Sequence, residues 1–345
     1  MIVSRTSWET PYVTTYATNV PMRMRIAVAI VIGVCTGSFC WFLLTRLHQG
    51  SADFTWAIRA AQHILERQNP YDTPLEQYPL TAAFFALPFV RMPAELAAGL
   101  FFGISSGLLA FGLTRKGYHR LLIFLAYPYW AALLTAQWSP LIAAGAFFPL
   151  LLPATMAKPQ IGIPVFLTHV SRRGLLACLV VAVLTLLAMP SWPWMWVKQF
   201  GYYEHFIPIA VVPGFVLLLA IARYRDRDAL LLLLAALVPQ RWFFDAFVLW
   251  IIPKTRREIV ATAAASWGAG IWRWYHIPHS FQQVGRWAVI FIYLPMLAVV
   301  LLRRRRDQDG APWTTATSRR DAWLRNIRLS RLIKKNSSSH VMAES

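Results

Sequence analysis

The sequence predicts an all-α protein that crosses a membrane several times. Of its 345 residues, 57% are hydrophobic and only 14% are charged, which lies outside the range of ordinary water-soluble domains. Apolar runs such as residues 26–44 and 175–189 approach or reach the roughly 20 residues that cross a hydrocarbon core as a helix. Because these runs do not alternate with polar residues, they exclude a membrane barrel and leave helices as the structure that satisfies the backbone in lipid.

The positive charge of the chain follows the pattern of membrane topology rather than that of nucleic-acid binding. The formal net charge is +19, and the basic residues form short clusters at the ends of apolar runs. The clusters are Arg5, Arg23 and Arg25; Arg115, Lys116 and Arg120; Arg172 and Arg173; Arg223, Arg225 and Arg227; Lys254, Arg256 and Arg257; and residues 303–306. By the positive-inside rule all of them face the cytoplasm, as do both termini.

The chain is expected to start with a cytoplasmic segment, residues 1–24, and a first span over residues 25–44 that runs outward. The outer loop 46–80 follows, and it is the only extended polar segment on the side that the basic clusters avoid. Residues 80–90 are too short to span and are broken by prolines, whereas residues 94–113 return to the cytoplasm.

Within the outer loop, the sequence predicts an amphipathic helix in the membrane interface. Its apolar positions Phe54, Ile58, Ala61 and Leu65 recur at helical spacing. The opposite face carries Arg59, Gln62, His63 and Glu66. The helix should end before Asn69-Pro70, since the residue before a proline is pushed out of the helical region.

The middle of the chain is expected to contain broken helices. Residues 121–135 run outward, and the four prolines between residues 149 and 164 then interrupt the apolar run, with Lys158 at a break that faces the outer cavity. Residues 175–189 go out and residues 207–222 come back. Between Arg227 and Lys254 there are too few residues for two full spans, so we expect a re-entrant pair with residues 239–245 at its tip.

The remaining segments complete a transmembrane domain over residues 25–302. Residues 259–271 rise to an aromatic outer loop, and residues 287–302 form the last span. Counting broken and re-entrant helices, we expect about nine to eleven membrane segments. The basic tail 303–345 should rest on anionic lipid or stay disordered in the cytoplasm.

Several short motifs in this order resemble glycosyltransferase family 87. They are an acidic residue that opens the outer loop (Asp53), an N-P-Y turn (Asn69, Pro70, Tyr71), a Y-P pair (Tyr78, Pro79), an outer glutamine (Gln137) and a K-P pair (Lys158, Pro159). The chain has Ala136 where a glycine commonly precedes the glutamine. The resemblance covers roughly residues 25–302 and implies a transmembrane helix bundle of GT-C type. It also implies a mannosyltransferase that uses a polyprenyl-phosphate sugar donor and a lipid or glycan hydroxyl acceptor outside the cytoplasm, in the inner membrane of a bacterium.

Asp53 is the predicted catalytic residue. Glycosyl transfer requires a hydroxyl to lose its proton as it attacks the anomeric carbon, and a carboxylate within hydrogen-bond reach can accept that proton. Asp53 is the carboxylate nearest the end of the first span. The alternative is an N-cap, since aspartate is a preferred cap and a helix is predicted to begin here. Without the resemblance the cap is favoured; with it, the general base is favoured.

Lys158 and Arg241 are the candidates to bind the phosphate of the donor. Both lie at breaks in apolar runs outside the cytoplasmic clusters, and cations inside a membrane are costly unless they face a cavity or a partner. The alternative for Arg241 is a salt bridge to Asp245, four residues later. No carboxylate lies near Lys158 in the sequence, which favours a functional role there.

The other candidate substrate-binding residues are weaker. His63 and Arg59 share the polar face of the predicted interfacial helix, where the alternative for His63 is a solvated histidine. Tyr71 and Tyr78 are candidates to line the sugar site, and Asn69 and Gln137 belong to the family motifs. No metal or other cofactor is expected, because no paired acidic motif follows Asp53.

Two other functions fit the same pattern. A transporter or flippase of a lipid-linked or anionic solute also uses broken helices with cations at membrane depth. The long outer loop and the absence of a visible repeat favour the enzyme. A membrane scaffold without activity is the third possibility.

Overall fold

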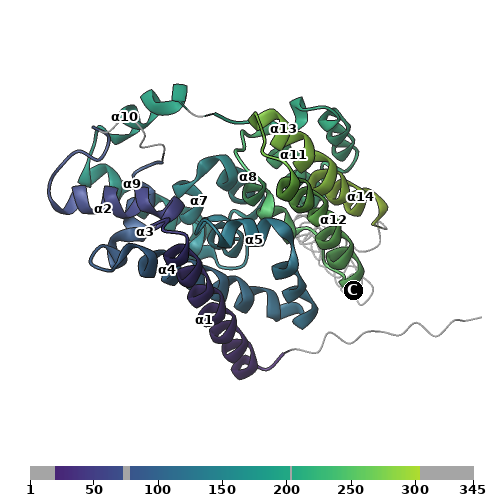
Figure 1. Cartoon of the computed structure of the whole chain (residues 1–345), viewed down its shortest axis with the longest axis horizontal. Coiled ribbons are helices and arrows are strands. Elements are labelled where there is room, and N and C mark those ends of the chain that lie inside the picture. Colours follow the sequence, from purple (N-terminus) through teal and green to yellow (C-terminus); the bar gives the residue numbers. More distant parts are fainter. Residues whose placement is uncertain (1–19, 73–77, 203, 304–345) are drawn as a thin grey trace, which may run out of the picture. The chain divides into compact units, whose positions relative to one another are not determined.

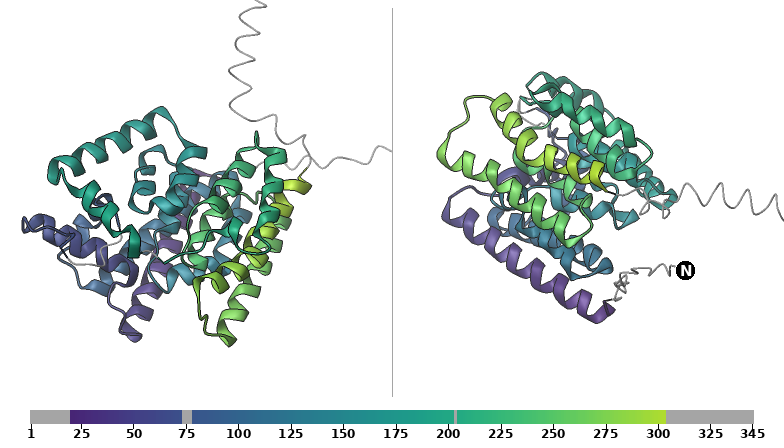
Figure 2. Two further views of the ribbon diagram at one scale, coloured as in Figure 1. Left: turned by 90° about the horizontal axis from the view of Figure 1, so that it is seen from above. Right: turned by 90° about the vertical axis from the view of Figure 1, so that its right-hand side faces the viewer.

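The structure, a computed structural model, describes residues 20–72, 78–202 and 204–303. Within these ranges the chain is helical, and its extended pairing is limited to an isolated bridge between Phe206 and Gln240 (Figures 1 and 2). This confirms the all-α prediction. The first 19 residues and the basic tail after Arg303, which we expect in the cytoplasm, lie outside the described residues, as do positions 73–77 of the outer loop.

Three helices in the described ranges are long and apolar enough to cross a membrane. They are α1 (Met22–Arg46); α4 (Ala94–Leu113) with the turn that follows it; and the continuous run of α13 (Phe281–Ala288), a π-helical turn (Val289–Tyr293) and α14 (Leu294–Leu302). A bent pair, α9 (Arg172–Ala188) and α10 (Trp192–Lys198), makes a fourth if it counts as one span. These helices contain the spans predicted at 25–44, 94–113 and 287–302.

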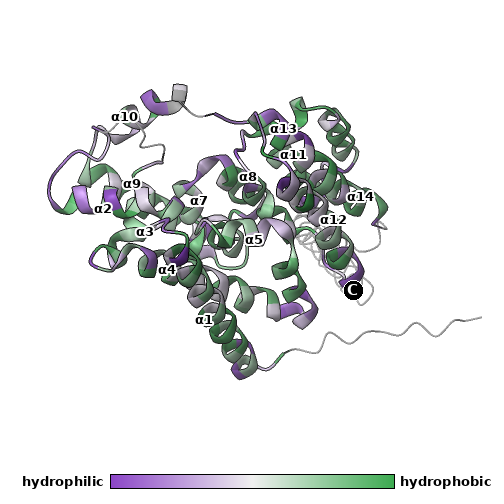
Figure 3. Ribbon diagram, in the orientation of Figure 1, coloured by the Kyte–Doolittle hydropathy of each residue, from purple (hydrophilic) through white to green (hydrophobic). Residues whose placement is uncertain are grey.

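The helix α1 is a single straight rod in the right-hand view of Figure 2, and its hydrophobic side chains colour it largely green in Figure 3. Many of these side chains, such as Ile30, Val31 and Val34, are exposed. Exposed aliphatic side chains along a helix of this length are typical of contact with lipid.

The middle of the chain is built from short helices, as the prolines predict. Pro128, Pro140 and Pro159 lie in the first turns of the helices that they begin, where the missing N–H is not needed, whereas Pro164 lies inside a helix. These segments are α5 (Tyr127–Leu133), α6 (Ser139–Gly145), α7 (Ala154–Ala157), α8 (Pro159–His169), α11 (Arg227–Leu237) and the 3-10 segments η4 (Tyr118–Leu125), η8 (Gly214–Arg223) and η9 (Phe243–Ile251). The longer helix α12 (Arg256–Tyr275) follows them and starts with a capping box between Thr255 and Glu258.

The outer-loop helix packs against protein rather than lying with its apolar face in lipid. Helix α2 (Thr55–Leu65) buries Ile58 and Ala61 and lies against α3 (Thr81–Ala86), whose alanines are buried. The small side chains of α3 allow this close approach. The prediction of an interfacial helix is therefore correct in its amphipathic pattern but wrong about what covers the apolar face; Leu65, expected on that face, is exposed.

Basic residues from distant segments gather at one end of the helices. Arg25 donates to the carbonyl of Phe111 at 2.8 Å, which places the start of α1 beside the end of α4. The buried Arg120 donates to the carbonyl of Pro253 at 2.6 Å, and the Lys254 ammonium lies 2.5 Å from Asp228. The positive-inside rule predicts that these residues face the cytoplasm.

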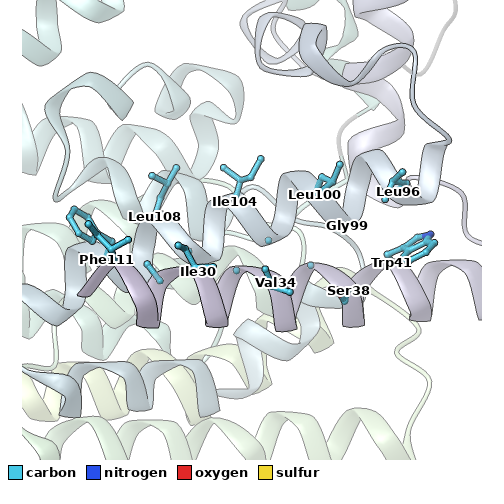
Figure 4. Close-up of a pocket in the computed structure, with 16 residues that line it drawn as sticks. Ile30, Val34, Ser38, Trp41, Leu96, Gly99, Leu100, Ile104, Leu108 and Phe111 are labelled. Carbon is cyan, nitrogen blue, oxygen red and sulfur yellow. The ribbon is translucent and has the colours of Figure 1, made fainter. Parts of the chain in front are cut away.

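Glycines bring α1 and α4 into backbone contact. A Cβ atom built on Gly103 would lie 2.5 Å from the carbonyl oxygen of Gly33 and 2.9 Å from the Cα of Gly37. Larger side chains of both helices, including Ile30, Leu100 and Ile104, flank this contact and line an apolar groove of about 630 Å³ (Figure 4). Small residues at helix contacts are a common device in membranes, where close packing replaces the hydrophobic effect as the driving force.

Gly103→Ala is expected to destabilise the protein although alanine is the better helix former. The substitution normally stabilises a helix by roughly 0.5–1 kcal/mol. Here the new methyl group meets backbone atoms that cannot move aside, and such overpacking costs about 1–3 kcal/mol. Thermal unfolding in detergent should therefore show a lower midpoint. Gly201→Ala is the control, because nothing lies within 4 Å of its Cβ; equal midpoints for the two variants would contradict the close contact.

Candidate functional site

Lys158 lies at the centre of a buried polar cluster. It occupies the non-helical junction between α7 and α8, and it is only 2% exposed. Its ammonium nitrogen donates to Gln137 Oε1 at 2.7 Å, and it lies 3.4 Å from Asp53 Oδ2 and 3.2 Å from Asp245 Oδ1. An ammonium has three donors, and three oxygens from three distant segments surround this one. The structure thus brings together Asp53, Gln137 and Lys158, which the sequence predicted as site residues.

Asp53 presents one carboxylate oxygen to the cluster and keeps the other open. It lies on the 3-10 turn η1 (Ala52–Phe54) that precedes α2. Oδ2 accepts a hydrogen bond from the Tyr78 hydroxyl at 2.6 Å as well as from Lys158. Oδ1 accepts none from the described residues, and the side chain is 23% exposed. The carboxylate does not cap α2, so the N-cap alternative is excluded for this structure.

Two strained turns position Asp53 and Gln137. Ala52 and Ala136, which directly precede them, both have φ of +48°, a left-handed conformation that costs a residue with a Cβ roughly 1–2 kcal/mol. The Asp53 N–H donates to the carbonyl of Thr135 at 3.2 Å and ties the two turns together. Backbone strain that is maintained by the surrounding structure is a feature of functional sites. A glycine at position 136 would adopt this conformation without the steric cost of a Cβ.

Buried aromatic side chains anchor these two turns in the hydrophobic core. Phe54 follows Asp53 and Trp138 follows Gln137, and both rings are fully buried. Both pack on Phe101, whose ring centroid lies 4.1 Å from that of Phe54 and 4.8 Å from that of Trp138. Each polar site residue is therefore followed by an aromatic residue that fixes its backbone in the core.

Asp245 is a member of the cluster that the sequence analysis did not assign to the site. It is fully buried at the start of η9, where its Oδ2 accepts from the backbone N–H groups of Arg241 (2.8 Å) and Trp242 (3.3 Å). Its Oδ1 is ion-paired with Lys158, without the alignment of a hydrogen bond. The signal was present in the sequence, because an ionisable residue inside the apolar run 243–252 is a functional candidate by default.

The contacts of Asp245 also correct two expectations. Lys158 was favoured as a phosphate ligand because no carboxylate lies near it in the sequence, but two carboxylates reach it through the fold. Asp245 interacts with Arg241 through the backbone N–H rather than through a salt bridge with the guanidinium. The guanidinium instead lies over the ring of Phe281, 5.7 Å from its centroid.

Asn69 and Tyr71 support the site indirectly, through Tyr78. The Asn69 side chain accepts from the Tyr71 N–H at 3.0 Å, which closes the N-P-Y turn. The Tyr71 hydroxyl donates to the carbonyl of Tyr78, also at 3.0 Å. This pair therefore fixes the backbone of the residue whose hydroxyl contacts Asp53, and it does not touch the buried cluster itself.

Arg59 and His63 lie on α2 outside the cluster. Arg59 is exposed, His63 is partly buried, and neither contacts Asp53, Gln137, Lys158 or Asp245. The structure does not bring these two predicted residues to the carboxylate. Within the described ranges no group of three or more His, Cys, Asp or Glu side chains could hold a metal ion.

Comparisons of the chain with models of protein families, with curated proteins and with solved structures find no match.

Proposed function

We propose that this protein is a membrane glycosyltransferase. It moves a sugar, mannose by its resemblance to family 87, from a polyprenyl-phosphate donor to a hydroxyl of a lipid or glycan acceptor on the outer side of a bacterial inner membrane. The observation that carries the proposal is the hydrogen bonding of the two Asp53 carboxylate oxygens. One of its oxygens is fixed by Tyr78 and Lys158, and the other is open to a substrate.

This geometry supports the following reaction. The acceptor hydroxyl donates to Oδ1 of Asp53, which takes the proton as the oxygen attacks the anomeric carbon of the donor. The bond from that carbon to the phosphate oxygen breaks on the opposite face, so the configuration inverts and polyprenyl phosphate leaves. The contacts from Lys158 and Tyr78 keep the carboxylate oriented during the transfer, which is a contribution of positioning.

The decisive experiment uses purified protein in detergent with polyprenyl-phosphate-mannose. Donor consumption is measured with and without candidate lipid and glycan acceptors. We expect consumption of the donor that depends on an acceptor hydroxyl. A protein that inserts and binds the donor but never consumes it with any acceptor would contradict the proposal.

A transporter or flippase is the second candidate. It is favoured by one observation, the lysine between two carboxylates in an apolar interior, because such ionisable groups mark ion and substrate pathways in membranes. Proteoliposomes with labelled polyprenyl-phosphate-mannose on one side distinguish the two functions. Movement of the intact donor across the bilayer, without sugar transfer, would support the transporter.

Tyr78→Phe tests the positioning of the base. The substitution removes the 2.6 Å hydrogen bond to Asp53 Oδ2 and leaves the ring, so kcat should fall roughly tenfold, the rate equivalent of one net hydrogen bond of about 1–1.5 kcal/mol. The donor KM should change little. Tyr129→Phe is the matched control, because it also removes a buried tyrosine hydroxyl, one bonded to Ser106 at 2.9 Å. Equal kcat values for the two variants would argue against a role for Tyr78.

A further inference from the structure

A second cavity, separate from the groove between α1 and α4, lies against the turn that carries Asp245. It has a volume of about 660 Å³ and is lined by residues from two connections, 204–205 and 277–282, together with Trp242 and Arg273. The Trp242 N–H donates to Asp245, so one backbone turn separates this cavity from the Lys158 cluster. We call it the arginine cleft, after the side chains described next.

Two arginines are stacked on the aromatic rings of the cleft. The Arg273 guanidinium lies over Trp242, 5.9 Å from the ring centroid, and that of Arg241 lies over Phe281 at 5.7 Å. The rings of Trp242 and Phe281 contact each other edge to face, with centroids 6.5 Å apart. Stacking on a ring face restrains a guanidinium without using its in-plane N–H donors.

Arg273 has N–H donors that make no hydrogen bond with the described residues. Its Nη1 donates to the carbonyl of His276 at 3.2 Å, and its Nε and Nη2 make no hydrogen bond with the described residues. Glu204 is the only carboxylate among the described lining residues. Because Arg273 lines the cleft and Arg241 lies at its edge, these three charged side chains give the cleft a net positive charge. A planar guanidinium with free donors matches the oxygens of a phosphate group.

Lys158, in contrast, is poorly placed to bind a phosphate. Its three donors face Gln137, Asp53 and Asp245, and it is almost fully buried. A phosphate that reached it would displace one of these partners and bring a further negative charge beside two carboxylates. The repulsion between like charges disfavours this arrangement.

We infer that the arginine cleft binds the phosphate of a polyprenyl-phosphate ligand, with Arg273 as a phosphate ligand beside Arg241. This inference rests on the proposed function for the identity of the ligand, and it transfers the role of phosphate binding away from Lys158. Three successive polar contacts of 2.8–3.4 Å connect the Arg241 backbone through Asp245 and Lys158 to Asp53. These contacts link the backbone at the edge of the cleft to the proposed base.

The test measures binding without catalysis. Purified full-length protein is titrated with farnesyl phosphate, with farnesol as the uncharged control and inorganic phosphate as a competitor. Arg273→Gln should weaken farnesyl phosphate binding about tenfold or more, because it removes a charge-assisted contact. The affinity of Arg273→Lys should lie between those of the wild type and Arg273→Gln, since lysine keeps the positive charge but lacks the paired N–H donors of the guanidinium. Binding of farnesol should not change.

Arg286→Gln is the matched control, an exposed arginine of α13 that does not line the cleft. Unchanged affinity in Arg273→Gln, or an equal loss in Arg286→Gln, would overturn the assignment. If inorganic phosphate competed for the site as strongly as farnesyl phosphate binds it, the cleft would be a site for free phosphate. This result would overturn the assignment of a polyprenyl-phosphate ligand. Because no sugar is transferred in this assay, its result is separate from that of the donor-consumption experiment.

Discussion

Asp53→Asn should reduce sugar transfer by about 100-fold to 10,000-fold, the usual range for loss of a general base. Asparagine has nearly the same shape, and its amide oxygen can still accept from Tyr78 and Lys158 at the position of Oδ2. The side chain can no longer take a proton from the acceptor. The effect should therefore appear in kcat, while the donor KM, membrane insertion and the detergent-solubilised yield stay near their wild-type values.

Asp72→Asn is the control for this substitution, because Asp72 is an exposed carboxylate of the same outer segment that contacts Asn69 rather than the cluster. Its activity should match that of the wild type. Full activity in Asp53→Asn would remove the general base from the proposed mechanism. An equal loss in both variants would indicate a defect of the outer loop rather than of the reaction.

The long helices could be predicted from the sequence because their signals are local. A continuous apolar run between basic residues is enough to place α1 and α4 within a few residues of their observed bounds. The breaks at Pro149, Pro153 and Pro159 were predictable for the same reason, since each of these prolines acts on its own turn. The break expected at Pro164 is wrong, because this residue lies inside α8. What covers a face was not predictable: α2 has the pattern of an interfacial helix, but its partner α3 is visible only in the fold.

The site could be predicted only in part, for a related physical reason. Motifs taken from a family resemblance pointed to Asp53, Gln137 and Lys158 separately, and the fold places oxygens of Asp53 and Gln137 within 3.4 Å of Lys158 Nζ. The pairing of Lys158 with Asp245 spans 87 positions of the chain and depends on how η9 packs beside α8. Sequence spacing carries no information about such a contact, and the partner it offered for Asp245, as an alternative, was Arg241, four residues away.

Lys158→Met should destabilise the protein strongly. Methionine fills a similar volume but leaves Asp245 as a fully buried carboxylate without its ion-pair partner, and removing one member of a buried pair typically costs about 3–5 kcal/mol. The backbone N–H groups of Arg241 and Trp242 still donate to Asp245 Oδ2, which places the expected loss at the lower end of this range. Unfolding of the purified variant in detergent against increasing denaturant provides the measurement.

The double variant Lys158→Met with Asp245→Asn separates the cost of a buried charge from the loss of packing. Asparagine keeps an oxygen acceptor for the two backbone N–H groups and carries no charge, so the double variant should recover more than half of the stability lost in Lys158→Met. Asp245→Asn alone should cost less than Lys158→Met, because Lys158 retains Asp53 as a counter-ion. If the losses of the two single variants simply add in the double variant, the lysine and the carboxylate are not coupled. The 3.2 Å contact would then have no energetic role, and Asp245 would act only on the turn at Arg241 and Trp242.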